Sequence, residues 1–157
     1  MSTTAVADRP LSYEEERGKP MPTQNHSGIQ TNLIIAFARM PEFRPFSELN
    51  LDLDGKRTVP DLCVYPAVRL DFRHDVTWRT DPPLLIVEIL SPRQAYEDVM
   101  DKISHYLESG VKSCWMVIPP TQSITIFSPG GVQKTFTEGT ITDPAIGLSA
   151  DLAAVFS

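Results

Sequence analysis

Two acidic residues lie inside apolar runs of this sequence. Glu88 interrupts LLIVEIL, which spans residues 84–90, and Asp61 interrupts TVPDLCVY. Such runs are typical of buried strands, where an unpaired carboxylate costs several kcal/mol. Side chains alternate along a strand, so Asp61 shares a face with Cys63, and Glu88 shares one with Ile86. If the two strands are neighbours, Asp61 and Glu88 face each other with about 5 Å between their Cβ atoms.

Two carboxylates this close repel each other unless a cation lies between them. A hard, oxygen-preferring ion such as Mg²⁺ or Mn²⁺ would supply the positive charge that Glu88 lacks. A buried salt bridge from Glu88 to Lys102 is the alternative, and Asp61, which follows Pro60, could also be a turn or strand-start residue. The residues alone leave both interpretations open, a metal site and a buried ionic cluster.

A second set of polar residues follows Glu88 on a predicted helix. Asp98, Lys102 and Tyr106 are spaced four apart and therefore share one helix face. If the adjoining apolar stripe packs on the sheet, Lys102 can reach the carboxylates and stabilise charge that develops on a phosphate. Taken singly, Lys102 is typical of a solvated helix residue, Asp98 of an exposed partner in a helical ion pair, and Tyr106 of the core.

The first third of the chain predicts a lead, a short connection and a helix. Residues 1–12 are polar, end near a proline and are expected to be a disordered lead. The segment YEEERGKPMP, residues 13–22, is expected to be extended. Residues 26–39 carry apolar side chains at helical spacing, so we predict an amphipathic helix with Asn25 as its N-cap.

The remaining segments predict a hairpin, a loop, a helix and more strands. Asp54 and Gly55 stand between two alternating runs and indicate a hairpin. Residues 69–83 are charged and turn-rich, which is typical of an exposed loop. A helix from Ala95 is expected to end at Gly110. Three further strands are predicted in SCWMVIPP, QSITIFS and GVQKTFT, and GLSADLAAVFS is expected to be a short helix or an extended cover.

This order of elements predicts one α/β (α+β) domain, residues 13–157, with a mixed sheet flanked by helices. The chain has 157 residues, of which 41% are hydrophobic and 22% charged, as in soluble globular proteins. Its net charge of −6 argues against a generally basic nucleic-acid coat. Without a long apolar span or a signal-peptide core, we expect no membrane contact and a cytoplasmic location. Cys63 and Cys114 are expected to be reduced and buried.

The ordered motifs resemble a known protein family. The segments YEEERGKPMP, VPDLCVYP and LLIVEILSP, followed by Asp98, Lys102, Tyr106, Gly110-Val111 and Trp115, are similar to the putative restriction endonuclease family (Uma-two family) of the PD-(D/E)xK nuclease-like superfamily. The similarity runs from about residue 13 to the end of the chain. It implies a restriction-endonuclease-like fold and Mg²⁺- or Mn²⁺-dependent hydrolysis of DNA phosphodiester bonds.

Matched by position, the resemblance also assigns roles to individual residues. It implies that Asp61 and Glu88 are metal ligands, that the backbone carbonyl of Ile89 is a third ligand, and that Glu14 contacts the metal through water. Taken singly, Glu14 belongs to a run of three glutamates that is typical of a solvated surface.

The positively charged group of the site is assigned less directly. Lys102 matches the lysine that the family carries on its helix, whereas Leu90 stands where the superfamily's usual lysine would lie, so activity would depend on Lys102 as a substitute. Asp98, Tyr106 and His26 are possible supporting residues. The family places a histidine at the position of His26, although a first-turn helix residue is its plain interpretation.

Partners and activity remain expectations at this point. The resemblance implies DNA as substrate, and we expect its phosphates to contact Arg73 and Arg79 in the loop and Arg93 beyond it. Cutting both strands of a duplex favours a two-fold homodimer. The alternative is a catalytically silent nuclease-like scaffold that acts as a binding or regulatory protein. The negative charge and the lack of an appended DNA-reading domain favour that alternative.

Overall fold

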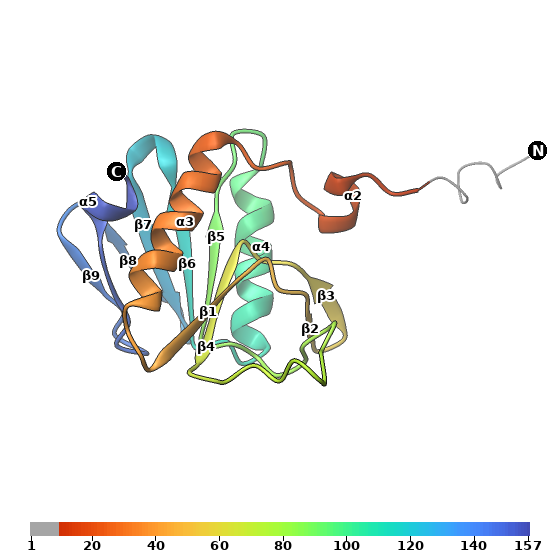
Figure 1. The fold of residues 1–157 in the computed structure, drawn as a ribbon. Coiled ribbons are helices and arrows are strands. Elements are labelled where there is room, and N and C mark those ends of the chain that lie inside the picture. Colours follow the sequence, from red (N-terminus) through yellow and green to blue (C-terminus); the bar gives the residue numbers. More distant parts are fainter. Residues whose placement is uncertain (1–9) are drawn as a thin grey trace, which may run out of the picture.

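The computed structural model describes residues 10–157, apart from the side chains at positions 13 and 16. Within this range, six strands form one mixed sheet (Figure 1). Strands β5 and β6 are parallel, and the other neighbouring pairs are antiparallel. A parallel pair needs a crossover connection, which helix α4 (Tyr96–Glu108) supplies. In spatial order the strands are β1 (Phe43–Ser47), β4 (Leu62–Pro66), β5 (Leu85–Ile89), β6 (Ser113–Ile118), β7 (Ser123–Ser128) and β8 (Val132–Phe136).

Helices and a hairpin cover the two faces of this sheet. Helices α3 and α5 pack on one face around a core that includes Val87 and Trp115, and α4 and the β2–β3 hairpin pack on the other around Ile86 and Tyr106. Figure 1 shows α3 and α4 on opposite sides of β5. Since side chains alternate along β5, Glu88 points to the α4 side with Ile86. The elements are α3 (Gln24–Ala38), α5 (Leu152–Val155), β2 (Leu51–Leu53) and β3 (Lys56–Thr58).

The predicted mixed α/β architecture is confirmed, and so are several local features. Asp54 and Gly55 turn between β2 and β3 with φ angles of 53° and 80°, the left-handed conformation that a two-residue hairpin turn requires. Residues 69–83 form a loop whose only ladder contact is an isolated bridge at Arg79. Gly110, with φ of 101°, follows α4 directly after its cap. The three strands predicted after α4 are β6, β7 and β8, and the C-terminal segment holds β10 (Ser149–Asp151), paired with β9 (Thr140–Thr142), and then α5.

The N-terminal segment contains a helix where the sequence predicts an extended piece. Helix α2 covers Tyr13–Arg17. Its N-cap is Ser12, whose hydroxyl accepts a hydrogen bond from the Glu15 backbone N–H at 3.2 Å, and Gly18 ends the helix with a φ of 66°. The prediction is wrong because these caps stabilise a helix too short to show apolar periodicity. The predicted disordered lead, residues 1–12, falls mainly on residues 1–9, which lie outside the described residues.

Helix α3 begins earlier than predicted. It starts at Gln24, and its N-cap is Thr23 instead of Asn25, because the Thr23 hydroxyl accepts a hydrogen bond from the His26 backbone N–H at 3.3 Å. Threonine and asparagine are both favourable caps, so the sequence pattern could not choose between them. The consequence is that His26 lies on the buried stripe of the helix, three residues before Ile29.

Two further expectations concern cysteines and membranes. Cys63 and Cys114 are free and buried, as predicted. Burial raises the pKa of Cys63 to about 12 and that of Cys114 further, so both thiols stay protonated and unreactive at neutral pH. Among the described residues, no helix combines the length and the apolar character needed to span a membrane.

A buried aspartate ties the C-terminal segment to the sheet. Asp143 is 0% exposed and accepts hydrogen bonds from the Ser113 hydroxyl, from Trp115 Nε1 at 2.8 Å and from the Ala145 backbone N–H at 2.8 Å. Trp115 in turn packs edge-on against Phe37 of α3, with 5.4 Å between the ring centroids. One carboxylate therefore holds β6, the central tryptophan and the β9–β10 connection together.

We predict that Asp143→Ala lowers the free energy of unfolding by about 2–4 kcal/mol, because it leaves buried hydroxyl and indole donors without an acceptor. Urea denaturation of both proteins measures the change. Asp151→Ala, which removes the exposed cap of α5, is the matched control and should cost about 1 kcal/mol or less. Equal losses in the two variants would contradict a structural role for Asp143.

Candidate functional site

Asp61 and Glu88 lie opposite each other where β4 and β5 meet. Leu62 pairs with Val87 across the antiparallel ladder, so the next position outward places Asp61 across from Glu88. The two residues are only 1% and 2% exposed. Alternation along the strands sends both side chains to the α4 side of the sheet. The structure thus brings together the two carboxylates that the sequence singles out.

The Asp61 carboxylate is held by three donors. Its Oδ2 accepts a hydrogen bond from the Ile89 backbone N–H at 2.7 Å. Its Oδ1 lies 2.6 Å from Lys19 Nζ and 3.1 Å from His26 Nε2, and both of those side chains are less than 10% exposed. Burial raises the pKa of Asp61, but the His26 hydrogen bond and the Lys19 charge outweigh it and lower the pKa to about 2. Asp61 is therefore ionised throughout the physiological range.

Glu88 has far less support. Its Oε1 accepts a hydrogen bond from the Tyr106 hydroxyl at 2.8 Å, and its Oε2 is buried without a hydrogen-bond partner among the described residues. Burial and then the Asp61 charge raise the pKa of Glu88 to about 7, which the charges of Lys19 and Lys102 offset only in part. At neutral pH this carboxyl exists in both protonation states. Of the two carboxyls, Glu88 is the one whose negative charge is least compensated by its neighbours.

Tyr106 belongs to the core and to the cluster at once. It is 1% exposed, and its hydroxyl also lies 3.0 Å from Thr58 Oγ1 on β3. Burial, followed by the Glu88 charge, raises the Tyr106 pKa well above its usual value. The hydroxyl therefore remains a proton donor that fixes one oxygen of Glu88.

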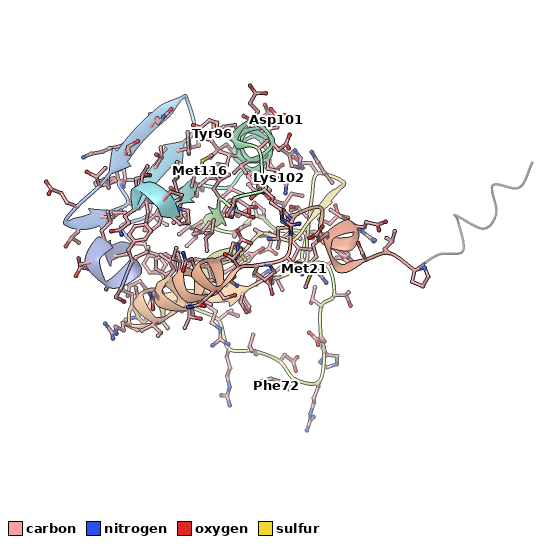
Figure 2. All side chains as sticks on the ribbon, turned by 90° about the horizontal axis from the view of Figure 1, so that it is seen from above. Met21, Phe72, Tyr96, Asp101, Lys102 and Met116 are labelled. Carbon is pink, nitrogen blue, oxygen red and sulfur yellow. The ribbon has the colours of Figure 1, made fainter. Side chains whose placement is uncertain are left out.

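Lys102 lies at the rim of the cluster. Its Nζ is 3.5 Å from the Gly18 carbonyl oxygen, at the outer limit of a hydrogen bond. Figure 2 shows Lys102 on the side of α4 that faces the segment carrying Met21. Its charge acts on Glu88 from a distance. Asp98, one turn earlier on α4, is exposed.

The predicted water-mediated ligand and the predicted DNA contacts lie outside the carboxylate pair. Glu14 Oε1 accepts a hydrogen bond from Arg93 at 2.9 Å, so these two residues neutralise each other at the surface. Arg79 forms a two-point ion pair with Asp81, at 2.8 and 3.1 Å, and stacks 3.5 Å from the centre of the Tyr65 ring. Both arginines are therefore already engaged.

The third predicted DNA contact lies in the exposed part of the 69–83 loop. Arg73 is exposed, and its backbone N–H is bound by the Asp71 carboxylate at 3.0 Å. The neighbouring Phe72 is 92% exposed, and Figure 2 shows it at the end of the loop farthest from the sheet. Of the three arginines, Arg73 presents the side chain best placed to meet an external phosphate.

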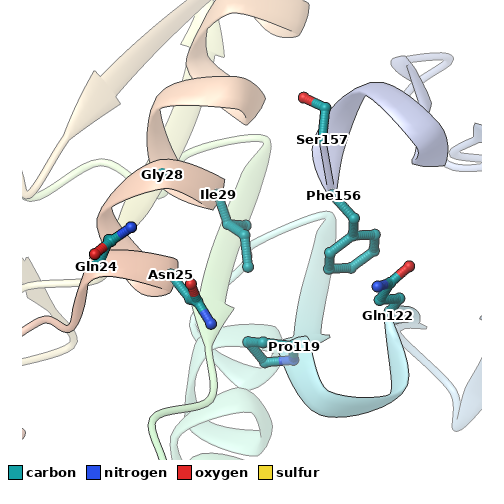
Figure 3. Close-up of a pocket in the computed structure, with 8 residues that line it drawn as sticks. All are labelled: Gln24, Asn25, Gly28, Ile29, Pro119, Gln122, Phe156 and Ser157. Atoms are coloured by element: carbon teal, nitrogen blue, oxygen red, sulfur yellow. The ribbon is translucent and has the colours of Figure 1, made fainter.

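The carboxylate cluster borders a hollow at the end of β5 and β6. A cavity of about 360 Å³ is lined by His26, Leu90 and Gln94, among other residues. A neighbouring cavity of about 300 Å³ lies between the start of α3, the turn after β6 and the C-terminus, and Figure 3 shows the side chains of Asn25 and Phe156 bordering it. The two cavities share Asn25 and Pro119 as lining residues. A ligand can therefore approach His26 from this edge of the sheet, and His26 in turn contacts Asp61.

The donor set of the pair is suited to a hard divalent cation. No group of three or more His, Cys, Asp and Glu side chains that could hold a metal occurs within residues 10–157. However, Mg²⁺ usually keeps several waters and binds through only one or two carboxylates. Glu88 Oε2 is a buried acceptor without a partner in the described part of the chain, and the Ile89 carbonyl lies next to it in sequence. These oxygens fit Mg²⁺ or Mn²⁺ in chemistry and number.

Comparisons with known proteins agree with this fold. The mixed sheet with one parallel pair and a crossover helix is also the fold of a putative nuclease of known structure. Residues 13–153 match the sequence profile of the family described as putative restriction endonuclease (Uma2), and the chain belongs to this family. The crystal structure of a putative nuclease belonging to DUF820 from Anabaena variabilis has a TM-score of 0.75 and 26% identity to this chain, and the match covers 87% of this chain and 83% of that one. A search of curated proteins found no match.

We predict that the metal-free protein loses stability as the pH rises from about 4.5 to about 7. Glu88, with a usual pKa of 4.5 and a pKa of about 7 in the folded protein, binds its proton more tightly when folded. The unfolded chain then holds fewer protons in this window, so the free energy of unfolding falls with pH, by an amount on the order of 3 kcal/mol.

Urea denaturation at several pH values in EDTA measures this slope, and Glu88→Gln should flatten it. Asp61 affects stability in a lower pH range. Its pKa falls from 3.8 to about 2 on folding, so the stability that its ionised form contributes is lost only below pH 4. The same slope in wild type and in Glu88→Gln would mean that another group causes it.

Proposed function

We propose that this protein is a Mg²⁺-dependent endonuclease that hydrolyses DNA phosphodiester bonds. Its membership of the putative restriction endonuclease family supports a hydrolase that acts on nucleic acid. The observation that carries the proposal is the buried pair of Asp61 and Glu88, in which Glu88 Oε2 is without a described partner. A fold does not retain an uncompensated buried carboxylate for stability, because an apolar residue there would be more favourable.

The metal ligands in this proposal are Asp61 Oδ1, Glu88 Oε2 and the Ile89 carbonyl. A Mg²⁺ ion bound there supplies Lewis-acid polarisation of the phosphate and a water of lowered pKa. The protein orients the ligands: the Ile89 backbone N–H holds Asp61 Oδ2, and the Tyr106 hydroxyl holds Glu88 Oε1. In the proposal, the other oxygen of each carboxylate, Asp61 Oδ1 and Glu88 Oε2, would bind the ion. Lys102 adds positive charge from α4 and favours charge that develops on the phosphate oxygens.

DNA binding in this proposal is weak and sensitive to salt. The net charge of −6 repels phosphates overall, so contacts depend on a few local cations. Arg73 on the projecting loop and Arg93, once released from Glu14, are the proposed phosphate contacts. In this proposal the strand approaches through the cavity beside His26, which contacts Asp61. Cleavage of both strands would further require a second copy of the chain.

A silent scaffold is the second candidate, and one observation favours it. The Lys19 ammonium lies 2.6 Å from Asp61 Oδ1, so half of the carboxylate pair is already neutralised without a metal. In a scaffold, Asp61, Lys19 and His26 would form a permanent ionic cluster with a binding or regulatory role. The two candidates differ in their response to divalent cations.

We predict that Mg²⁺ or Mn²⁺ raises the melting temperature of the wild-type protein. A ligand that binds only the folded state stabilises it by RT ln(1 + [L]/Kd), which is about 2.7 kcal/mol at a hundredfold excess over Kd. Asp61→Asn should lose the rise because it removes one ligand charge. Differential scanning fluorimetry with increasing Mn²⁺ measures both proteins, and an equal rise in the variant would place the ion elsewhere.

We predict that Lys102→Met lowers Mn²⁺-dependent nicking of plasmid DNA by about a hundredfold or more while Mn²⁺ binding is kept. Methionine retains the bulk of the side-chain stem and removes the charge that acts in the transition state. If Lys102 only balances Glu88 in a scaffold, the variant should instead be less stable, with metal partly restoring stability.

Supercoiled plasmid assays and thermal melts on the same preparations separate the two outcomes. Nicking by the wild type that persists in Lys102→Met would remove Lys102 from the catalytic group. Absence of nicking by the wild type with every metal would favour the scaffold.

A further inference from the structure

The cation that touches the carboxylate pair is Lys19, on the connection between α2 and α3. Its Nζ lies 2.6 Å from Asp61 Oδ1, and its side chain is 7% exposed. The Lys19 charge also acts on Glu88 more strongly than that of Lys102. Lys102, by contrast, reaches only the Gly18 carbonyl at 3.5 Å. Lys19 is therefore better placed than the helix lysine to act at this site.

The connection that carries Lys19 is held over the site by surface contacts. Gly18 ends α2 in a left-handed conformation, which turns the chain back toward the sheet. The Lys102 ammonium lies near the Gly18 carbonyl, and Arg93 binds Glu14 of α2 at 2.9 Å with both side chains well exposed. Exposed ion pairs of this kind contribute little stability. Arg17 of α2 also pairs with Glu48 at 3.0 Å, with the two side chains 14% and 34% exposed. The movement that release of Lys19 requires is therefore that of the Lys19 side chain and of the connection after Gly18, while Arg17 still holds α2.

Lys19 and a metal ion compete for the same oxygen. Asp61 Oδ2 is taken by the Ile89 backbone N–H, so a cation binds at Oδ1, which also lies 3.1 Å from His26 Nε2. A Mg²⁺ ion lies about 2.1 Å from its oxygen ligands, so with Lys19 2.6 Å from the same atom the two positive charges would be close neighbours in a buried site. Their repulsion is strong where water is excluded. The site can hold the ammonium or the divalent ion on Oδ1 far better than both.

We propose that Lys19 is the built-in counter-cation of this site: it neutralises Asp61 in the metal-free protein, leaves Asp61 when a divalent cation binds, and then contacts the substrate phosphate. The proposal rests on the metal site of the proposed function. It gives the site the nearby lysine that Leu90 does not supply. It also explains how the fold tolerates Asp61 beside Glu88 before metal arrives, since one of the two negative charges is always compensated.

The competition predicts that Lys19→Gln binds Mn²⁺ about tenfold or more tightly than the wild type. Glutamine retains a hydrogen-bond donor for Asp61 and removes the competing charge, so the fold is kept. Lys19→Arg retains the charge and should stay near the wild-type affinity. Lys112→Gln, which makes the same change at an exposed lysine after α4, should leave the affinity unchanged. Isothermal titration with Mn²⁺ alone measures all four proteins, with a thermal melt in EDTA to verify folding.

The release of Lys19 has a second readout that does not depend on activity. Amide hydrogen exchange in residues 10–22 of the wild type should become faster when Mn²⁺ is added, because the buried contact of this segment is lost. Unchanged or weaker Mn²⁺ affinity in Lys19→Gln, or unchanged exchange in this segment, would overturn the proposal.

The contact with phosphate is tested by cleavage at saturating Mn²⁺. Lys19→Gln should nick plasmid DNA about tenfold or more slowly than the wild type although it binds metal more tightly. A variant that binds tighter and cleaves as fast as the wild type would remove the phosphate contact from the assignment. If the wild type does not cleave DNA, the proposed function fails, whereas the titration and the exchange experiment still decide whether Lys19 competes with the metal.

Discussion

Two carboxylates buried side by side are the constraint on which the rest of this structure depends. Asp61 and Glu88 are each almost fully removed from water, where like charges repel strongly and lack hydration. Four parts of the chain meet to compensate them: the Lys19 connection, the first turn of α3 with His26, the backbone of β5, and Tyr106 of α4. The compensation is uneven. Asp61 is fully satisfied, and Glu88 keeps one unpaired oxygen in the described chain.

The sheet fixes this arrangement through register. The antiparallel pairing of β4 with β5 sets Asp61 across from Glu88, and the parallel pairing of β5 with β6 requires the crossover that brings α4 and Tyr106 over the same face. A slip of one residue would turn Glu88 into the apolar core under α3. Apolar neighbours disfavour the slip, because Val87 packs in the core under α3 and Ile86 in the core under α4, and a slip would exchange them.

The sequence predicts the strands and helices that carry the site residues well, because each of them has a local hydrophobic pattern. Alternation along the two apolar runs predicts that Asp61 and Glu88 face each other once the strands pair. Helical spacing puts Lys102 and Tyr106 on one face of α4, where Tyr106 contacts Glu88 and Lys102 stays at the rim. Caps are less predictable, because Thr23 and Asn25 are both favourable N-cap residues and the local pattern does not choose between them. The predicted roles of the site residues remain predictions, since their geometry is known and their chemistry is not.

Lys19 could not be found from local pattern at all. Its partner Asp61 is 42 residues away, and the contact exists because α2 ends at Gly18 and reverses the chain, in a segment with no apolar periodicity. Glu14, on the helix before this reversal, pairs with Arg93. Long-range ion pairs between irregular segments depend on tertiary structure. The Lys19–Asp61 ion pair, a short contact of the site, is therefore also its least predictable one.

The central claim is that the carboxylate pair is a divalent cation site. Anomalous diffraction from crystals equilibrated with Mn²⁺ at neutral pH tests it most directly. The account predicts a single strong peak within about 2.5 Å of Asp61 Oδ1 and Glu88 Oε2, with the Lys19 ammonium moved away from Asp61. A saturated crystal with no peak between these oxygens, and with Lys19 still paired to Asp61, would contradict it.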